Sequence, residues 1–127
     1  MDKVKFELEV AINASSGMLF QYISTPSSLQ EWFADKVNTR GEIFSFIWDG
    51  VEEQAELVIK KSNERIRFKW LESEDDDSYF EIRIQEHPLT NDVSLVITDF
   101  ADDEDDVDEA KQLWESQIEE LRHTIGA

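Results

Sequence analysis

The last quarter of the chain carries the most regular pattern of apolar residues. From Asp103 to Ile125 they recur every three or four positions, and at about 100° per residue they fall in one arc roughly 80° wide. These residues are Val107, Ala110, Trp114, Ile118, Leu121 and Ile125. The opposite side is charged, and Asp103 can cap the start. The pattern predicts a long amphipathic helix whose Trp-centred stripe has to be covered by another part of the fold.

Most of the chain before this helix alternates between apolar and polar residues, as half-buried strands do. The predicted strands span residues 3–12, 36–38, 42–48, 52–60, 65–71, 79–85 and 93–98. The Asp-Gly pair at 49–50 is a strong hairpin signal, and residues 74–77 are predicted to form a charged loop. Connections this short predict an antiparallel meander.

Two short helices are predicted between the first and second strands. Ser15 or Ser16 can cap the first, and Thr25 can cap the second, where Pro26 suits the first helical position. Their apolar faces carry Leu19, Tyr22, Ile23, Leu29, Trp32 and Phe33. The order of elements predicts a single α+β domain over residues 1–127. In it, a curved antiparallel sheet of about six to seven strands is crossed on its concave side by the C-terminal helix.

The chain is strongly acidic, with 30 Asp and Glu residues against 12 Lys and Arg and a net charge of -18. Phosphate backbones and anionic membranes should repel it, so nucleic-acid binding is not expected. Such a charge usually means only that the protein surface is well solvated. It is also compatible with binding to a basic protein partner. The absence of cysteine excludes disulfides and thiol catalysis. No long apolar stretch predicts a membrane span or a signal peptide, so we expect a cytoplasmic location.

The sequence contains no recognisable catalytic or metal-binding motif. His87 and His123 have no motif around them and are expected at the surface. The acidic run that starts at Asp102 does not fit a calcium-binding loop, because Val107 stands where the loop needs glycine and Leu113 where it needs glutamate. We therefore predict a protein that is not an enzyme, with no catalytic residue, metal or cofactor.

Three basic residues, Arg65, Arg67 and Lys69, share one face of a predicted strand. They could form an anion site. The stronger expectation is that they meet Glu81 and Arg83 in cross-strand pairs on a solvated face of the sheet.

Three stretches together resemble a known family. Residues 19–34 read as a helix, a Thr-Pro step and then the pair Trp32-Phe33. A strand ending in the sequence Phe-Ile-Trp-Asp-Gly at 46–50 is followed by one that closes on Phe-Lys-Trp at 68–70. Trp114 and Leu121 follow on the last helix. In this order the stretches resemble the START-like (helix-grip, SRPBCC) superfamily, and most closely the branch related to activators of the heat-shock-chaperone ATPase.

The resemblance implies a deep cavity between the curved sheet and the long helix. In this superfamily the cavity takes lipids, sterols, polyketides or other apolar molecules, and a few members carry out chemistry there. The resemblance also implies that the activator branch can work through protein contacts. For an enzyme of the cyclase type, this chain offers no constellation of residues.

Large apolar side chains are the candidate lining of such a cavity: Trp32, Phe33, Phe46, Trp48, Phe68, Trp70, Phe80, Ile82, Trp114, Ile118 and Leu121. Simple core packing is the alternative role for them. Among them, Trp32 and Phe33 are expected to be partly exposed near the mouth. The candidate polar contacts are Tyr22, Ser45, Tyr79 and Thr98.

The preferred hypothesis is a non-enzymatic module that binds a small apolar or lipid-like molecule between the sheet and the last helix. The alternative is an acidic protein-interaction module, such as a chaperone-ATPase regulator, with a basic protein partner.

Overall fold

The computed structural model describes residues 3–73 and 78–127, so the charged loop predicted at 74–77 lies outside the described residues. The described chain forms seven strands: β1 (Val4–Ala11), β2 (Lys36–Arg40), β3 (Ile43–Trp48), β4 (Val51–Lys61), β5 (Arg65–Trp70), β6 (Phe80–Glu86) and β7 (Val93–Ala101). Its helices are α1 (Ser16–Ser24), α2 (Pro26–Trp32) and α3 (Val107–Ile125), with short 3-10 turns η1 (Leu71–Ser73) and η2 (Glu104–Asp106). The predicted α+β class and order of elements are confirmed.

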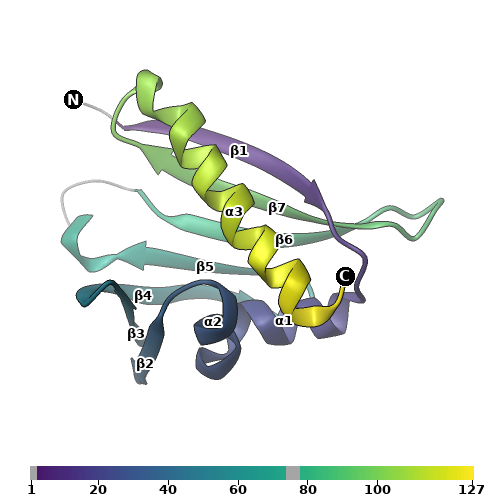
Figure 1. Ribbon diagram of the computed structural model, residues 1–127, viewed down its shortest axis with the longest axis horizontal. Helices are drawn as coiled ribbons and strands as arrows, with labels where there is room; N and C mark the ends of the chain where they lie inside the picture. The colour runs from purple at the N-terminus through teal and green to yellow at the C-terminus, as the bar shows by residue number, and fades with distance from the viewer. Residues whose placement is uncertain (1–2, 74–77) are drawn as a thin grey trace.

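The strands form one antiparallel sheet in the order β1-β7-β6-β5-β4-β3-β2. The first strand therefore lies at one edge, beside the last strand. The two short helices α1 and α2 carry the chain to the opposite edge, where β2 begins (Figure 1). From there the strands return one by one across the sheet, which is the meander that the short connections predict.

The register aligns large apolar residues across the middle of the sheet. Phe68 lies opposite Phe80, and Ile82 lies opposite both Ile66 and Ile97. All five side chains are buried. Because paired residues on antiparallel strands point to the same face, this register builds one continuous apolar surface.

Helix α3 crosses the sheet diagonally and covers this surface (Figure 1). Trp114, Ile118 and Leu121 of its predicted stripe are buried. The remaining residues of the stripe, Val107, Ala110 and Ile125, are partly buried and pack against the core. The helix ends at Ile125, and the left-handed conformation of Gly126 (φ 75°) lets the N–H of Ala127 donate to the carbonyl oxygen of Arg122 at 2.8 Å. None of the helices in the described residues is long and apolar enough to cross a membrane.

The ends of several elements differ from the prediction. Asp103 caps the η2 turn, where its side chain accepts a hydrogen bond from the N–H of Asp105, and the α-helix begins at Val107. Strand β7 continues to Ala101 because β1 pairs with it as far as the Val4–Ala101 pair. The Thr25 hydroxyl donates to the carbonyl oxygen of Gln21 in α1 instead of capping α2, whereas Ser15 caps α1 as predicted.

The outer face of the sheet is held by charged and aromatic pairs. Arg67 and Arg65 reach the same carboxylate oxygen of Glu81, at 3.0 and 3.5 Å. The Arg67 guanidinium also lies 3.9 Å from the centre of the Tyr79 ring. These contacts confirm the expected cross-strand pairing with Glu81, and they satisfy a carboxylate that is itself buried.

The two leucines of α3 give a direct test of how much the covered stripe contributes to stability. Leu121 is fully buried, whereas Leu113 is 64% exposed on the same helix. We expect Leu121→Ala to lower the free energy of unfolding by about 2–5 kcal/mol, because it leaves a cavity in the core. Leu113→Ala should change it by about 0.5 kcal/mol or less. Urea denaturation of both variants measures the difference, and equal losses would contradict the packing described here.

Candidate functional site

Phe33, directly after α2, is the centre of a cluster of aromatic rings between the sheet and α3. Its ring centroid lies 5.0 Å from that of Phe46, and 5.5 Å from those of Phe80 and Trp114. Phe46 and Phe80 are themselves almost fully buried. The middle of the space between the sheet and α3, where the resemblance implies a deep cavity, is thus occupied by the chain's own side chains.

An open pocket of about 440 Å³ remains beside this cluster. It is lined by Phe33, Trp48, Glu53, Trp70, Asp99, Leu113, Trp114 and Gln117. These residues come from the end of α2, from β3, β4, β5 and β7, and from α3. Trp48 and Trp70 are half-buried, with ring centroids 6.4 Å apart and ring planes at 56°. Their rings therefore form a corner, and the pocket has mainly aromatic walls with several polar groups.

Asp99 is a half-buried acid of this pocket. It lies opposite Phe6 in the pairing of β1 with β7, and so on the inner face of the sheet. Its Oδ2 accepts a hydrogen bond of 2.8 Å from Nε1 of Trp114, and its Oδ1 accepts one of 2.8 Å from the N–H of Phe100. Burial raises the pKa of the Asp99 carboxyl, and the bonds from Trp114 and Phe100 and the charge of Lys3 only partly oppose this shift.

The carbonyl oxygen of Phe33 links α2, β3 and α3 at one wall of the pocket. It accepts hydrogen bonds from Nε1 of Trp48 at 2.8 Å and from Nε2 of Gln117 at 3.0 Å. A second hollow of about 610 Å³ adjoins this wall. It shares Phe33, Trp48, Leu113 and Gln117 with the aromatic pocket and also touches Trp32. The exposed Leu113 therefore borders both spaces.

The structure divides the predicted cavity residues into two groups. Phe33, Trp48, Trp70 and Trp114 line the aromatic pocket, and Trp32 lines the adjoining hollow. The others are buried in the core, at most 1% exposed, and do not line the pocket: Phe46, Phe68, Phe80, Ile82, Ile118 and Leu121.

The expected partial exposure of two aromatic residues is wrong. Trp32 and Phe33 are each only 4% exposed. The indole of Trp32 donates to the carbonyl oxygen of Tyr22 in α1, and the Phe33 ring packs among the other aromatic rings. The half-exposed tryptophans are instead Trp48 and Trp70, at the ends of their strands.

The polar side chains of the pocket are also different from those expected. None of Tyr22, Ser45, Tyr79 and Thr98 lines it. Asp99 and Glu53 line it instead. The alternation along the strands indicates that both point inward. Asp99 continues the buried series Leu95 and Ile97, and Glu53 precedes the buried Ala55 by two residues. Sequence reasoning missed both because acidic residues are so frequent in this chain.

The two histidines lie away from the aromatic pocket. Nε2 of His87 is 3.5 Å from a carboxylate oxygen of Glu9, and His123 is exposed on α3. His87 borders a different hollow of about 720 Å³ near the C-terminal end of α3, which is lined by polar and small residues together with Arg122. Within the described residues, no three His, Asp or Glu side chains gather in a way that could hold a metal ion.

The Trp114–Asp99 hydrogen bond gives a prediction about pH. We expect the Asp99 carboxyl to titrate above the ordinary range for aspartate, and Trp114→Phe to raise its pKa further because the lost indole bond favours the charged form. Since the folded state then binds this proton more tightly than the unfolded chain does, the stability that Asp99 contributes should fall as the pH rises from the unfolded to the folded pKa. The carboxyl 13C shift measures the titration.

The matched control for this titration is Trp48→Phe, since the Trp48 indole lines the same pocket but donates to Phe33. It should leave the Asp99 pKa nearly unchanged. A downward shift of this pKa in Trp114→Phe would contradict the role given to the hydrogen bond.

Comparison with known proteins places the chain in a family. A family model for the START-like superfamily domain matches residues 1–127, and no curated protein matches the chain. The solved structure of BfR322 from Bacteroides fragilis is 39% identical, with a TM-score of 0.69 and coverage of 98% of this chain and 93% of that protein.

Two further solved structures share the fold at low identity. The Aha1 dimer from Colwellia psychrerythraea is 13% identical, with a TM-score of 0.72 and coverage of 95% and 93% of the two chains. DynU16, from the dynemicin biosynthetic locus, is 15% identical, with a TM-score of 0.80; the match covers 97% of this chain and 47% of DynU16. The family model over the whole chain and the 39% identical relative confirm the resemblance: the chain belongs to the START-like superfamily.

Proposed function

We propose that this chain is a non-enzymatic binding domain that holds a small apolar ligand in the aromatic pocket. The observation that carries the proposal is the pair of half-buried rings, Trp48 and Trp70, beside an open space of about 440 Å³. This volume lies within the range of small-molecule sites. Binding is favourable when an apolar molecule covers exposed aromatic surface of this kind, because apolar surface is removed from water. Membership of a superfamily that includes ligand-binding proteins supports the same proposal.

The position proposed for the ligand differs from the deep cavity of the resemblance. Phe33, Phe46 and Phe80 fill the centre, so the ligand would lie between the open ends of β3, β4 and β5 and the middle of α3. Leu113, which is 64% exposed, stands at this opening and would cover part of the bound molecule. The adjoining hollow is lined largely by polar and charged residues, among them Glu31, Asp35 and Glu120, so the apolar part of the ligand is placed in the aromatic pocket alone.

Binding is favoured over catalysis by the chemistry of the lining. Neither histidine lines the pocket, and among the described residues its lining includes no serine, threonine or lysine that could serve as a nucleophile. The Asp99 carboxylate accepts hydrogen bonds from Trp114 and Phe100, which fixes it in place. Catalysis by general acid and base needs a second positioned group, and Glu53 is not hydrogen-bonded to Asp99.

Blocking the opening tests this proposal. We expect the wild-type protein to bind the neutral dye Nile red saturably, and Leu113→Trp to weaken this binding roughly tenfold or more, because the larger ring fills the opening. Dye fluorescence measures the affinity. The matched control is Leu89→Trp, which adds the same ring at a fully exposed position on the β6–β7 hairpin and should leave binding unchanged. Equal dye binding by Leu113→Trp and the wild type would count against the pocket.

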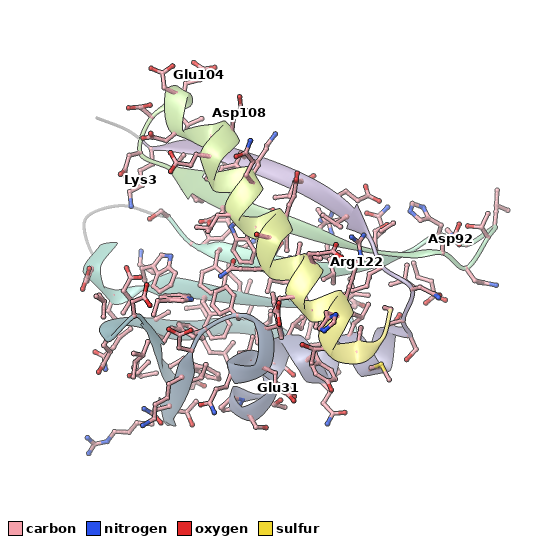
Figure 2. The ribbon with its side chains drawn as sticks, in the orientation of Figure 1. Lys3, Glu31, Asp92, Glu104, Asp108 and Arg122 are labelled. Atoms are coloured by element: carbon pink, nitrogen blue, oxygen red, sulfur yellow. The ribbon has the colours of Figure 1, made fainter. Side chains whose placement is uncertain are left out.

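A second candidate function is an acidic protein-interaction module, such as a regulator of the heat-shock-chaperone ATPase. The observation that favours it is the row of exposed acids from 102 to 106 at the start of α3, which Figure 2 shows projecting from one end of the molecule. The Asp103 carboxylate raises the pKa of Asp106, which means that these charges repel one another. A basic surface on a partner would relieve this repulsion.

The acidic row predicts a salt-sensitive effect on the chaperone. If the domain changes the ATPase rate, we expect the effect to fall between low and physiological salt, and to be lost in the variant Asp102→Asn, Asp105→Asn, Asp106→Asn. A steady-state ATPase assay measures it. The control removes three exposed charges elsewhere, with Glu31→Gln, Glu42→Gln and Glu52→Gln, and should retain the effect. Equal loss in both variants would show a dependence on net charge and not on the acidic row.

A further inference from the structure

The charge of the aromatic pocket restricts the kind of ligand it can take. The described residues that line it include two acids, Glu53 and Asp99, and no basic side chain. An adjoining hollow of about 430 Å³ shares Glu53 and Trp70 with it, and adds Glu72, Asp102 and Lys3. The lining of both spaces thus has four carboxylates against one ammonium group. We infer that the ligand is an amphipathic cation, with an apolar body against the rings and a protonated amine between Glu53 and Asp99.

Glu53 lies on the inner face of β4, directly opposite Phe46. It is half-buried, and it makes no hydrogen bond or ion pair with another described residue. Its neighbour Glu52 lies opposite Ile47, on the outer face, and is exposed. A carboxylate on the inner, aromatic face of a sheet costs desolvation that an outward position avoids. A positive group in the pocket would offset this cost through a charge-assisted hydrogen bond.

Asp99 supplies a second negative group in the same pocket. Its two hydrogen bonds come from neutral donors, Trp114 and Phe100, so they do not cancel its charge. Lys3 is the cation whose charge acts on it, and the Lys3 amine also donates to the hydroxyl oxygen of Ser78 at 3.4 Å. Figure 2 shows Lys3 near the N-terminal end of α3, at the opposite end of the helix from Arg122.

The two tryptophans provide the other half of the recognition. Trp48 and Trp70 line the pocket together with Glu53 and Asp99, and their ring centroids are 6.4 Å apart, so both indoles lie near the place proposed for the amine. Cations are attracted to indole faces within about 6 Å of the ring centre. The net charge of -18 also raises the local concentration of cations around the protein. A ligand with a carboxylate, by contrast, would place like charges beside Glu53 and Asp99.

Three probes of one shape test the charge of the ligand: phenylbutylamine, phenylbutanol and phenylpentanoate. Each carries a phenyl ring and four methylene groups, and at neutral pH they end in an ammonium, a hydroxyl and a carboxylate. We expect the amine to bind roughly tenfold more tightly than the alcohol, and the carboxylate most weakly. Titration calorimetry gives the affinities, and shifts of the indole N–H signals of Trp48, Trp70 and Trp114 show whether each probe occupies the pocket.

A matched pair of variants on one strand tests the residue that selects the charge. Glu53→Gln should lower the ratio of amine to alcohol affinity about threefold, whereas Glu52→Gln, one residue away on the outer face, should leave it unchanged. Asp99→Asn is a second variant with the same expected direction. Glu53→Gln changes a half-buried side chain without a partner among the described residues, so its fold is expected to be intact.

This inference rests on the proposed function, and the outcomes separate the two. Equal affinities for the amine and the alcohol, or a preference for the carboxylate, would overturn the cationic ligand and leave the apolar pocket in place. An amine preference that neither Glu53→Gln nor Asp99→Asn reduces would also overturn it. If none of the three probes and no Nile red bound to the folded protein, both the proposed function and the cationic ligand would fail.

Discussion

The packing of Trp114 against the sheet is the contact on which the rest of the structure depends. Its ring lies 5.5 Å from Phe33 and 5.8 Å from Phe80, and its indole N–H donates to Asp99. One side chain thus joins α3, the end of α2, and strands β6 and β7. The outer surface of α3 is polar, so its position on the sheet is determined by this buried stripe.

The same packing determines where a ligand can bind. Phe33 is drawn into the centre by Trp114, Phe46 and Phe80, and its carbonyl oxygen is held by Trp48 and Gln117. The space that a helix-grip fold encloses is therefore divided, with a filled centre and two open pockets that both touch Phe33. Rings that stabilise the core continue directly into the rings that line the pocket, from Phe80 to Trp70 and from Phe46 to Trp48.

The fold could be predicted from the sequence because its signals are periodic and local. The stripe from Val107 to Ile125 and the alternation in the strands depend on backbone geometry alone. Four residues of the pocket, Phe33, Trp48, Trp70 and Trp114, are among those predicted to line a cavity. The position of the pocket and its acidic residues could not be predicted, because they depend on packing between distant segments. Nothing local to Phe33 indicates that it turns inward beneath Trp114, and nothing near Asp99 indicates an indole donor fifteen residues later. The extension of β7 to Ala101, set by pairing with β1, is what places Asp99 within the sheet.

Glu53 is a stronger indication of a bound cation than Asp99 is. The Trp114 indole needs an acceptor when buried, and Asp99 satisfies it, so a structural role accounts for an acceptor at this position. A neutral amide would provide such an acceptor without the desolvation that raises the pKa of Asp99. Glu53 has no structural partner among the described residues, although it shares the inner face with Phe46 and Trp48. Within residues 3–73 and 78–127 neither packing nor pairing explains its carboxylate, and a positively charged ligand beside the tryptophans would account for it.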